Sequence, residues 1–206
     1  MIRFTNVSKR FKNQPNNIFE NLSFNFEPKL VYVLRGANGS GKTTLIKLIS
    51  SLLKVNSGSI EVPEKCKISY VSSNERSFFG RMTGHQNLEF FSKLDNGSNK
   101  KLDEFIAEYN EAFRFNEFLN KKFIHMSSGQ KKKMAIARAF SKKSSILLLD
   151  EPFNFLDESS RQALNMLIKN SVKSGKYVIL ATNNHEFHSH DFVRNIVIRR
   201  KKIENN

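Results

Sequence analysis

The sequence contains one cysteine, no tryptophan and only four prolines among 206 residues. A single cysteine, Cys66, excludes an internal disulfide, so the fold must depend on a hydrophobic core, and one thiol fits a reducing compartment. Runs of eighteen or more apolar residues are also missing, and residues 1–6 lack the charged lead and apolar block of a secretory signal. We therefore expect a chain that neither spans a membrane nor enters the secretory route.

Acidic residues are few, which leaves a formal net charge of +15. A basic surface can meet nucleic acid or anionic lipid, or it can be solvated lysine without a partner. Basic residues are scattered from Lys9 to Lys202, and their runs are as short as Lys131-Lys132-Lys133. No single stripe indicates a nucleic-acid groove, and both interpretations stay open.

The apolar pattern predicts an α/β fold built on a mostly parallel sheet. Strand-like runs fall at 2–7, 22–26, 31–34, 67–72, 146–149 and 177–181. The last three are almost continuously apolar, as in strands buried on both faces. Apolar residues from Lys42 to Leu53 form a broad helical face, so a helix should follow the strand at 31–34.

Between about residues 76 and 134 the pattern becomes helical. Thr83 and Gln86 have the spacing of a capping box before an apolar run, and a second helical pattern extends from Leu102 to Phe113. Neither a repeat nor a linker isolates this stretch. We expect one domain, with a core at 1–75 and 135–206 that carries a helical subdomain at about 76–134.

A complete phosphate-binding loop follows the third expected strand and opens the expected helix. The motif reads Gly36, Ala37, Asn38, Gly39, Ser40, Gly41, Lys42 and Thr43, with Thr44 next in the helix. Glycines allow backbone N–H groups to turn toward phosphate oxygens, and the helix N-terminus adds positive potential. We expect Lys42 to reach the β- and γ-phosphates of ATP and Thr43 to ligate Mg²⁺. The alternative is a glycine-rich turn that matches by chance.

Two acidic residues, Asp150 and Glu151, follow the apolar strand at 146–149. Ligands of open parallel sheets lie at the carboxyl ends of their strands. We expect Asp150 to hold the Mg²⁺ shell and Glu151 to orient or deprotonate the water that attacks the γ-phosphate. A solvated acidic turn is the alternative.

The segment Met126-Ser127-Ser128-Gly129-Gln130, with the basic helix after it, resembles the signature of ABC transporter ATP-binding cassettes. The resemblance extends over essentially the whole chain and implies the ABC type of P-loop NTPase fold, with N-terminal antiparallel strands on a RecA-like core. It implies that Ser127 and Gly129 face the γ-phosphate held by a second cassette, with Ser128 and Gln130 as further nucleotide-binding residues. ATP and Mg²⁺ would then lie between two chains, in a homodimer or heterodimer. A serine that merely caps a basic helix is the alternative.

Two weaker landmarks come from the same resemblance. Phe11 resembles the aromatic residue that stacks on adenine, although it can also be a core residue. Asn154-Phe155-Leu156-Asp157 resembles the loop that crosses the dimer interface, and Asp157 can also cap a helix that begins near Glu158.

Two departures from the family pattern concern hydrolysis. The family's metal-contacting glutamine is missing from Ser72-Ser73-Asn74-Glu75, where Ser73 is our candidate metal ligand. Asn183 stands where the family has a histidine on the γ-phosphate, and Asn cannot carry a proton. His185 is a less favoured replacement. We expect an ATPase whose rate these two changes leave open.

The resemblance also implies transmembrane permease subunits as partners and a place on the cytoplasmic face of a plasma or organellar membrane. Residues 72–91 resemble ABC-2-type exporter cassettes, and a weaker likeness connects the chain with the haem-exporter cassette of cytochrome c maturation. Phe78 and Phe79, near Arg76 and Arg81, form either a docking pocket for a permease helix or part of the core. The alternatives are a catalytically weak regulatory subunit and a cassette protein that acts on nucleic acid or ribosomes.

Overall fold

The computed structural model describes residues 1–12, 14–95, 98–182, 191–199 and 202–205. The chain divides into two compact units, each described here by itself. The sheet unit comprises residues 1–70, 145–151 and 171–206, and the helical unit comprises residues 71–144 and 152–170. The expected helical stretch at 76–134 lies within the helical unit, which also takes in 71–75, 135–144 and 152–170 from the part expected to be core.

An antiparallel sheet opens the sheet unit. Its strands β1 (Ile2–Lys9), β2 (Phe19–Phe26) and β4 (Ser57–Glu61) have the order β2-β1-β4. Both partners of β1 run antiparallel to it, and register shifts interrupt the pairing with each of them. The buried positions of β1 and β2 carry apolar side chains, so one face of this sheet supplies core residues.

The second sheet has six strands in the order β5-β6-β7-β3-β8-β9. They are β3 (Val31–Arg35), β5 (Ile68–Val71), β6 (Ile146–Asp150), β7 (Tyr177–Ala181), β8 (Val193–Arg199) and β9 (Lys202–Asn205). Strand β3 runs parallel to β7 and β8, β6 runs parallel to β7, and β9 is antiparallel to β8. Every residue of β6 and β7 is buried, which explains their continuous apolar sequence.

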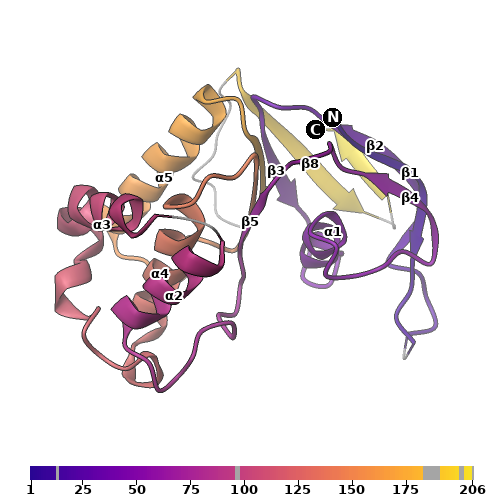
Figure 1. Cartoon of the computed structure of the whole chain (residues 1–206). Coiled ribbons are helices and arrows are strands. Elements are labelled where there is room, and N and C mark those ends of the chain that lie inside the picture. Colours follow the sequence, from indigo (N-terminus) through magenta and orange to yellow (C-terminus); the bar gives the residue numbers. More distant parts are fainter. Residues whose placement is uncertain (13, 96–97, 183–190, 200–201, 206) are drawn as a thin grey trace. The chain divides into compact units, whose positions relative to one another are not determined.

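Helix α1 (Lys42–Ile49) lies beside both sheets of the sheet unit (Figure 1), and its buried residues join them in one core. We expected this helix to extend to Leu53, which is wrong. Ser50 caps its C-terminal end, and Ser51 takes a left-handed conformation with φ 58°. That conformation interrupts the helical hydrogen-bond ladder, so the chain leaves the helix at Ile49.

The helical unit contains α2 (Gly84–Leu94), α3 (Asn99–Phe113), α4 (Ser128–Phe140) and most of α5 (Glu158–Lys173), with short 3-10 turns η1 (Phe115–Glu117) and η2 (Phe123–His125). Helix α2 begins with the predicted capping box. The Thr83 side chain accepts from the Gln86 N–H, and the Gln86 side chain accepts from the Thr83 N–H. Phenylalanines fill the interior, and Phe113, Phe115 and Phe118 are almost fully buried.

In the part of the chain that the structure describes, none of the helices has both the length and the apolar character to cross a membrane.

Candidate functional site

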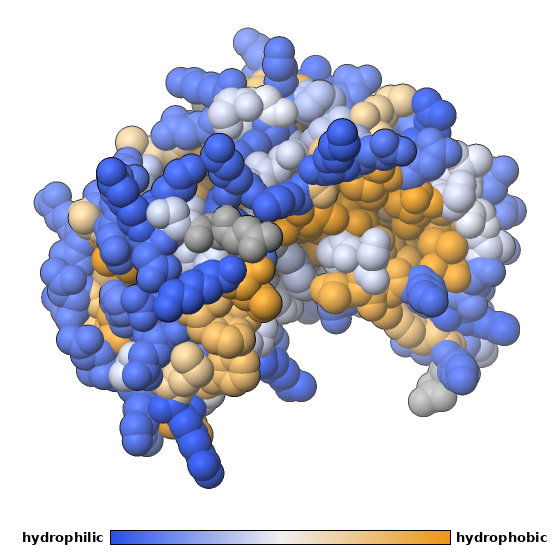
Figure 2. Space-filling model, viewed as in Figure 1, coloured by the Kyte–Doolittle hydropathy of each residue, from blue (hydrophilic) through white to orange (hydrophobic). Residues whose placement is uncertain are grey.

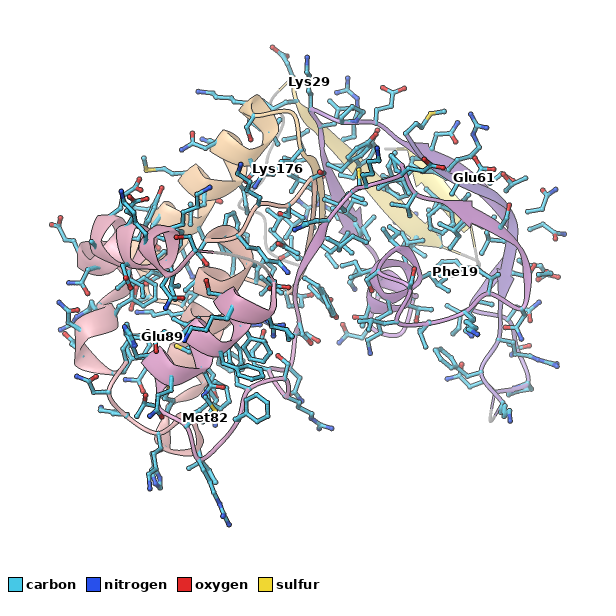
Figure 3. The ribbon with its side chains drawn as sticks, viewed as in Figure 1. Phe19, Lys29, Glu61, Met82, Glu89 and Lys176 are labelled. Carbon is cyan, nitrogen blue, oxygen red and sulfur yellow. The ribbon has the colours of Figure 1, made fainter. Side chains whose placement is uncertain are left out.

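The phosphate-binding loop lies between β3 and α1, as the sequence predicts. Gly36, Gly39 and Gly41 have φ values of 150°, 82° and 112°, a region that favours glycine. Two of them also border other groups closely. A Cβ at Gly36 would lie 2.8 Å from the Ile198 carbonyl oxygen, and a Cβ at Gly41 would lie 2.8 Å from the ring of Phe19, which Figure 3 labels. The positive φ favours glycine at all three positions, and close neighbours also require it at Gly36 and Gly41.

Lys42 begins α1 and is 8% exposed. Its Nζ donates to the carbonyl oxygens of Gly36 and Ala37, at 2.7 and 3.3 Å. These acceptors are neutral, whereas a phosphate oxygen would accept a stronger, charge-assisted hydrogen bond. The ammonium group thus lies folded over the loop, within reach of a ligand bound there.

Ser40 provides a test of whether this loop suits a phosphate ligand. Its hydroxyl oxygen is buried without a hydrogen-bond partner, although buried hydroxyl groups are normally paired. A phosphate oxygen in the loop would accept the hydrogen bond that this hydroxyl can donate. The residues present therefore fit a phosphate group.

Thr43 and Asp150 meet inside the sheet unit. The Thr43 hydroxyl lies 3.0 and 2.9 Å from the two carboxylate oxygens of Asp150, which ends β6 and is 1% exposed. These are hard oxygen ligands of the kind that Mg²⁺ takes, with most of its shell left to water and phosphate. Clusters of three or more His, Cys, Asp or Glu side chains do not occur among the described residues. The pair therefore fits a Mg²⁺ ion that the protein contacts at few points.

Glu151 follows Asp150 and is the last residue of the segment 145–151 of the sheet unit. Its backbone has φ 46°, and its N–H donates to the Ala181 carbonyl oxygen over 2.8 Å. This bond continues the pairing of β6 with β7 by one residue and fixes the backbone that carries the carboxylate. The catalytic role of Glu151 stays a prediction.

Ser127 is the N-cap of α4 in the helical unit. Its side chain accepts from the Gln130 N–H at 3.2 Å, and the Gln130 side chain accepts from the Ser127 N–H at 3.1 Å. This reciprocal pairing leaves the Ser127 hydroxyl proton available to a ligand in front of the helix. The capping alternative therefore describes the geometry and does not exclude a nucleotide contact.

The loop before α5 is attached to the start of α4. Lys133 Nζ lies 2.7 Å from the Asp157 carboxylate, and Asp157 caps α5 by accepting from the Ser160 N–H at 3.0 Å. Burial would raise the pKa of Asp157, but hydrogen bonds from Lys133 and Ser160 outweigh it and hold this pKa well below its usual range. The expected helix-capping role is present.

These attachments include residues that sequence reasoning missed. Lys133, and the buried pair of Lys132 with Glu75, appear in the sequence only as parts of polar runs. Lys133 and Asp157 are 24 positions apart, so local spacing gave no signal for their contact.

Of the remaining predicted residues, Phe11 and Ser73 are described by the structure. Phe11 is half-buried and lies outside the hydrophobic core, with Lys9 Nζ 5.4 Å from its ring centroid. Ser73 lies on an exposed turn of the helical unit, and its metal role stays a prediction. Asn183 and His185 lie outside the described residues.

A family model described as "ABC transporter" matches residues 19–154. A structure titled "Structure of ATP binding subunit of ABC transporter" has 20% sequence identity and a TM-score of 0.88, over 100% of this chain and 89% of that chain.

Two further structures are of the cassette MJ0796. One is described as a dimeric post-hydrolysis state bound to ADP and Pi, with 23% identity and a TM-score of 0.81, and the other as a dimeric bacterial ABC transporter cassette, with 23% identity and a TM-score of 0.82. Each alignment covers 99% of this chain and 97% of that chain. These likenesses show the fold, and the family model spans both the phosphate-binding loop and the signature segment. The chain belongs to the ABC transporter family.

Proposed function

We propose that this protein is the ATP-hydrolysing subunit of an ABC membrane transporter, which closes as a dimer on two MgATP molecules. The observation that carries the proposal is the phosphate-binding loop with its unpartnered Ser40 hydroxyl and the adjacent pairing of Thr43 with Asp150. Together they provide a phosphate cradle next to a pair of hard metal ligands.

Each residue has a separable role. Residues 36–44 hold the phosphates through backbone N–H groups and the Lys42 ammonium, and Phe11 stacks on the adenine. Thr43 and Asp150 hold the Mg²⁺ ion, with Ser73 as a further candidate, and Mg²⁺ neutralises charge on the phosphates. Glu151 orients or deprotonates the attacking water, and Asn183 donates a hydrogen bond to the γ-phosphate.

The second half of each site comes from another cassette. Ser127, Ser128, Gly129 and Gln130 form an anion cradle at the N-terminus of α4, and Asp157 lies beside it. This cradle binds best a phosphate that is already held in the phosphate-binding loop of the other cassette, so the nucleotide joins the two chains. Closure of the dimer then drives a conformational change in transmembrane subunits.

An exposed aromatic patch supports a permease as partner. Phe79 and Phe90 are 47% and 41% exposed, with ring centroids 5.1 Å apart, and Arg76 and Arg81, close to Phe79 in sequence, are also exposed. Figure 2 shows hydrophobic side chains reaching the surface over this part of the helical unit, and Figure 3 shows aromatic rings gathered beside α2 near Met82. Phe78, by contrast, is buried and stacks on Phe123, so one phenylalanine of the pair is core and the other is surface.

An apolar patch with a charged rim fits a short amphipathic helix of a membrane subunit. This partner would place the protein on the cytoplasmic face of a membrane. We also propose export as the direction of transport, on the resemblance of residues 72–91 to exporter cassettes.

The test is a trapped dimer. In the Glu151→Gln variant hydrolysis should stop while binding persists, so MgATP should convert monomer to dimer in sedimentation analysis. Lys42→Ala in the same background is the matched control and should stay monomeric because it loses its hold on the phosphates. A Glu151→Gln protein that stays monomeric at high concentration with saturating MgATP contradicts the proposal.

A further inference from the structure

In the helical unit, the chain just before α2 lies side by side with the chain that leads into η2. The Gly84 N–H donates to the Lys121 carbonyl oxygen at 3.1 Å, and Thr83 and Lys122 form an antiparallel bridge. Side chains alternate between the two faces of such extended segments. Phe123 is buried in the unit, whereas its neighbour Lys122 is exposed. The pairing therefore fixes an outward-facing surface on two segments that are far apart in the sequence.

Basic side chains occupy this surface. Arg81, Lys121 and Lys122 are exposed and belong to the two paired segments or directly adjoin them. Lys131 of α4 joins them from the neighbouring helix, because its Nζ lies 5.3 Å from the centroid of the Phe123 ring. Three stretches of chain thus contribute cationic groups to one part of the helical unit.

An exposed aliphatic side chain lies among these cations. Ile124 is 62% exposed, and a Cβ at Gly80 would lie 3.6 Å from the Ile124 Cβ, so Ile124 packs against the residue before Arg81. Figure 3 labels Met82, the next residue, at one end of the helical unit, and long side chains that carry nitrogen project from that end. Figure 2 shows hydrophobic and hydrophilic side chains together there. We call Arg81, Lys121, Lys122 and Lys131 with Ile124 the basic surface.

Negative charge is missing around the basic surface. Residues 76–88 and 118–149 contain neither Asp nor Glu. The acidic residues that flank these stretches, Glu75, Glu89 and Glu117, each pair with a Lys, His or Arg side chain of the helical unit. Within the described ranges, the exposed cations of the basic surface form no ion pair. Their charge is therefore directed to solvent or to an anionic partner.

We propose that the basic surface binds the anionic lipid headgroups of a membrane, with Ile124 entering the boundary between headgroups and acyl chains. The inference deepens the proposed function, which places the protein at a membrane. Lys and Arg are attracted to a surface that carries anionic lipid, and an apolar side chain beside them adds to the binding. The adjoining aromatic patch of Phe79 and Phe90 stays available to a permease subunit.

The composition of the basic surface favours lipid over other partners. Protein–protein interfaces are depleted of lysine, which is the main residue type here. Proteins that bind single-stranded nucleic acid combine basic grooves with aromatic rings on which bases stack, and the aliphatic Ile124 cannot supply such a platform. Lysines around an aliphatic group are typical of surfaces that lie on a membrane.

The experiment measures binding of the full-length protein to vesicles of phosphatidylcholine with and without phosphatidylserine. The wild type should bind only the vesicles with phosphatidylserine, and NaCl should weaken this binding by screening. Each basic side chain near an anionic surface changes partitioning about fivefold, so Arg81→Gln, Lys121→Gln and Lys122→Gln together should lower it on the order of a hundredfold. Ile124→Ser should lower it at least about threefold. All four side chains are exposed, so the melting temperature should not change.

The matched control removes the same charge elsewhere in the helical unit. Lys100→Gln, Lys101→Gln and Lys169→Gln together neutralise three exposed lysines of α3 and α5 and should keep vesicle binding within about threefold of the wild type. An equal loss in both triple variants would mean that only the net charge matters, and the inference would be wrong.

Other outcomes also decide the matter. A wild type that ignores anionic vesicles, or that binds RNA through these residues in place of vesicles, overturns the inference. Unchanged vesicle binding by the Arg81, Lys121 and Lys122 variant, together with lost co-purification of membrane subunits, would assign the surface to a permease. Dimerisation of the Glu151→Gln protein on MgATP needs no membrane, so a normal dimer without lipid binding leaves the proposed function standing. Lipid binding without a dimer overturns the proposed function alone.

Discussion

Glu75 and Lys132 form an ion pair inside the helical unit. Lys132 Nζ lies 2.6 Å from the Ser72 carbonyl oxygen and 3.5 Å from a Glu75 carboxylate oxygen, and the two side chains are 2% and 8% exposed. Burial raises the pKa of Glu75 to about 7, although the charges of Lys132 and Arg138 oppose this rise. The pair attaches the turn after β5 to α4, two positions beyond Gln130.

The raised pKa predicts that stability falls as pH rises. The native protein binds the Glu75 proton more tightly than the unfolded chain, so this stabilisation is complete below the ordinary pKa of 4.5 and is lost as pH passes through 7. The loss amounts to on the order of 3 kcal/mol. Glu75→Gln should remove it, and urea unfolding at pH 5.5 and 8.5 checks this. Glu61→Gln, at an exposed carboxylate, should leave the pH dependence as in the wild type.

A side chain at position 36 should weaken phosphate binding. In Gly36→Ala the new Cβ meets the Ile198 carbonyl oxygen and the Ser40 hydroxyl, so we expect ATP affinity to be lost together with about 1–3 kcal/mol of stability. Gly175→Ala is the matched control, because Gly175 has φ 86° but open space around it. It should cost about 1 kcal/mol and leave ATP affinity unchanged. Calorimetric titration and urea unfolding provide both measurements, and equal losses of affinity would contradict the steric argument.

At the scale of elements, Gly129 sets how closely α4 approaches the loop before α5. In Gly129→Ala the Cβ would press on the Phe155 carbonyl oxygen, so α4 or the loop must shift. We expect the free energy of unfolding to fall by about 1–3 kcal/mol and the MgATP-dependent dimer to weaken, because the start of α4 and the loop before α5 are pushed apart. Gly80→Ala is the control, because its Cβ makes only an ordinary contact with Ile124 at 3.6 Å. A Gly129→Ala protein with unchanged stability and dimerisation would show that this close approach is dispensable.

Elements with strong local patterns were the predictable part of the fold. The sequence indicated β3, the phosphate-binding loop, α1, β6 and β7, because apolar runs and a complete motif occur together there. Strand β4 was missed because Ser-Gly-Ser has no apolar alternation, and pairing with β1 makes it a strand. Strand β8 was missed because its buried residues, Val193, Ile196 and Ile198, depart from strict alternation.

In the candidate site, too, some residues could be predicted from motifs, whereas contacts between distant segments could not. Lys42, Thr43 and Asp150 belong to motifs that the sequence shows directly, and the structure brings Thr43 and Asp150 into hydrogen-bond contact. The contacts of Lys133 with Asp157 and of Gly129 with Phe155 join segments far apart in the chain. Only the folded helical unit brings those segments together, so the sequence could place Phe155 in a loop but could not show its approach to Gly129 or its positive φ.

For the whole molecule, three lysines of the helical unit form ion pairs, and because each pair is neutral, the net charge of +15 lies on other basic residues. Lys132, Lys133 and Lys142 pair with Glu75, Asp157 and Asp95 in the helical unit. Such lysines are needed by the fold and are not available to a polyanion. These contacts account for three basic residues and do not distinguish the two interpretations of the excess positive charge.

Nucleotide should stabilise the molecule through the sheet unit. A ligand that binds only the native state raises the free energy of unfolding by about 2.7 kcal/mol at one hundred times its dissociation constant. We expect MgATP to raise the melting temperature and to protect amides of β3 and α1 from hydrogen exchange, while α3 changes little. Lys42→Ala should abolish both effects. An equal effect of MgATP on that variant would place the nucleotide elsewhere.

The hydrogen bonds of Ser127 have a consequence for how signature variants are interpreted. The Ser127 hydroxyl oxygen caps the N-terminus of α4, and the proton of the same hydroxyl is proposed to reach a phosphate held by another chain. Ser127→Ala therefore removes a helix cap worth about 1 kcal/mol as well as a ligand contact, and the two losses are confounded. Ser127→Asp separates the capping effect from the ligand effect, since a carboxylate still caps the N-terminus of α4 but repels phosphate. The Ser127 hydroxyl thus serves both helix capping and phosphate recognition, and only a substitution that keeps an oxygen acceptor can change the second without losing the first.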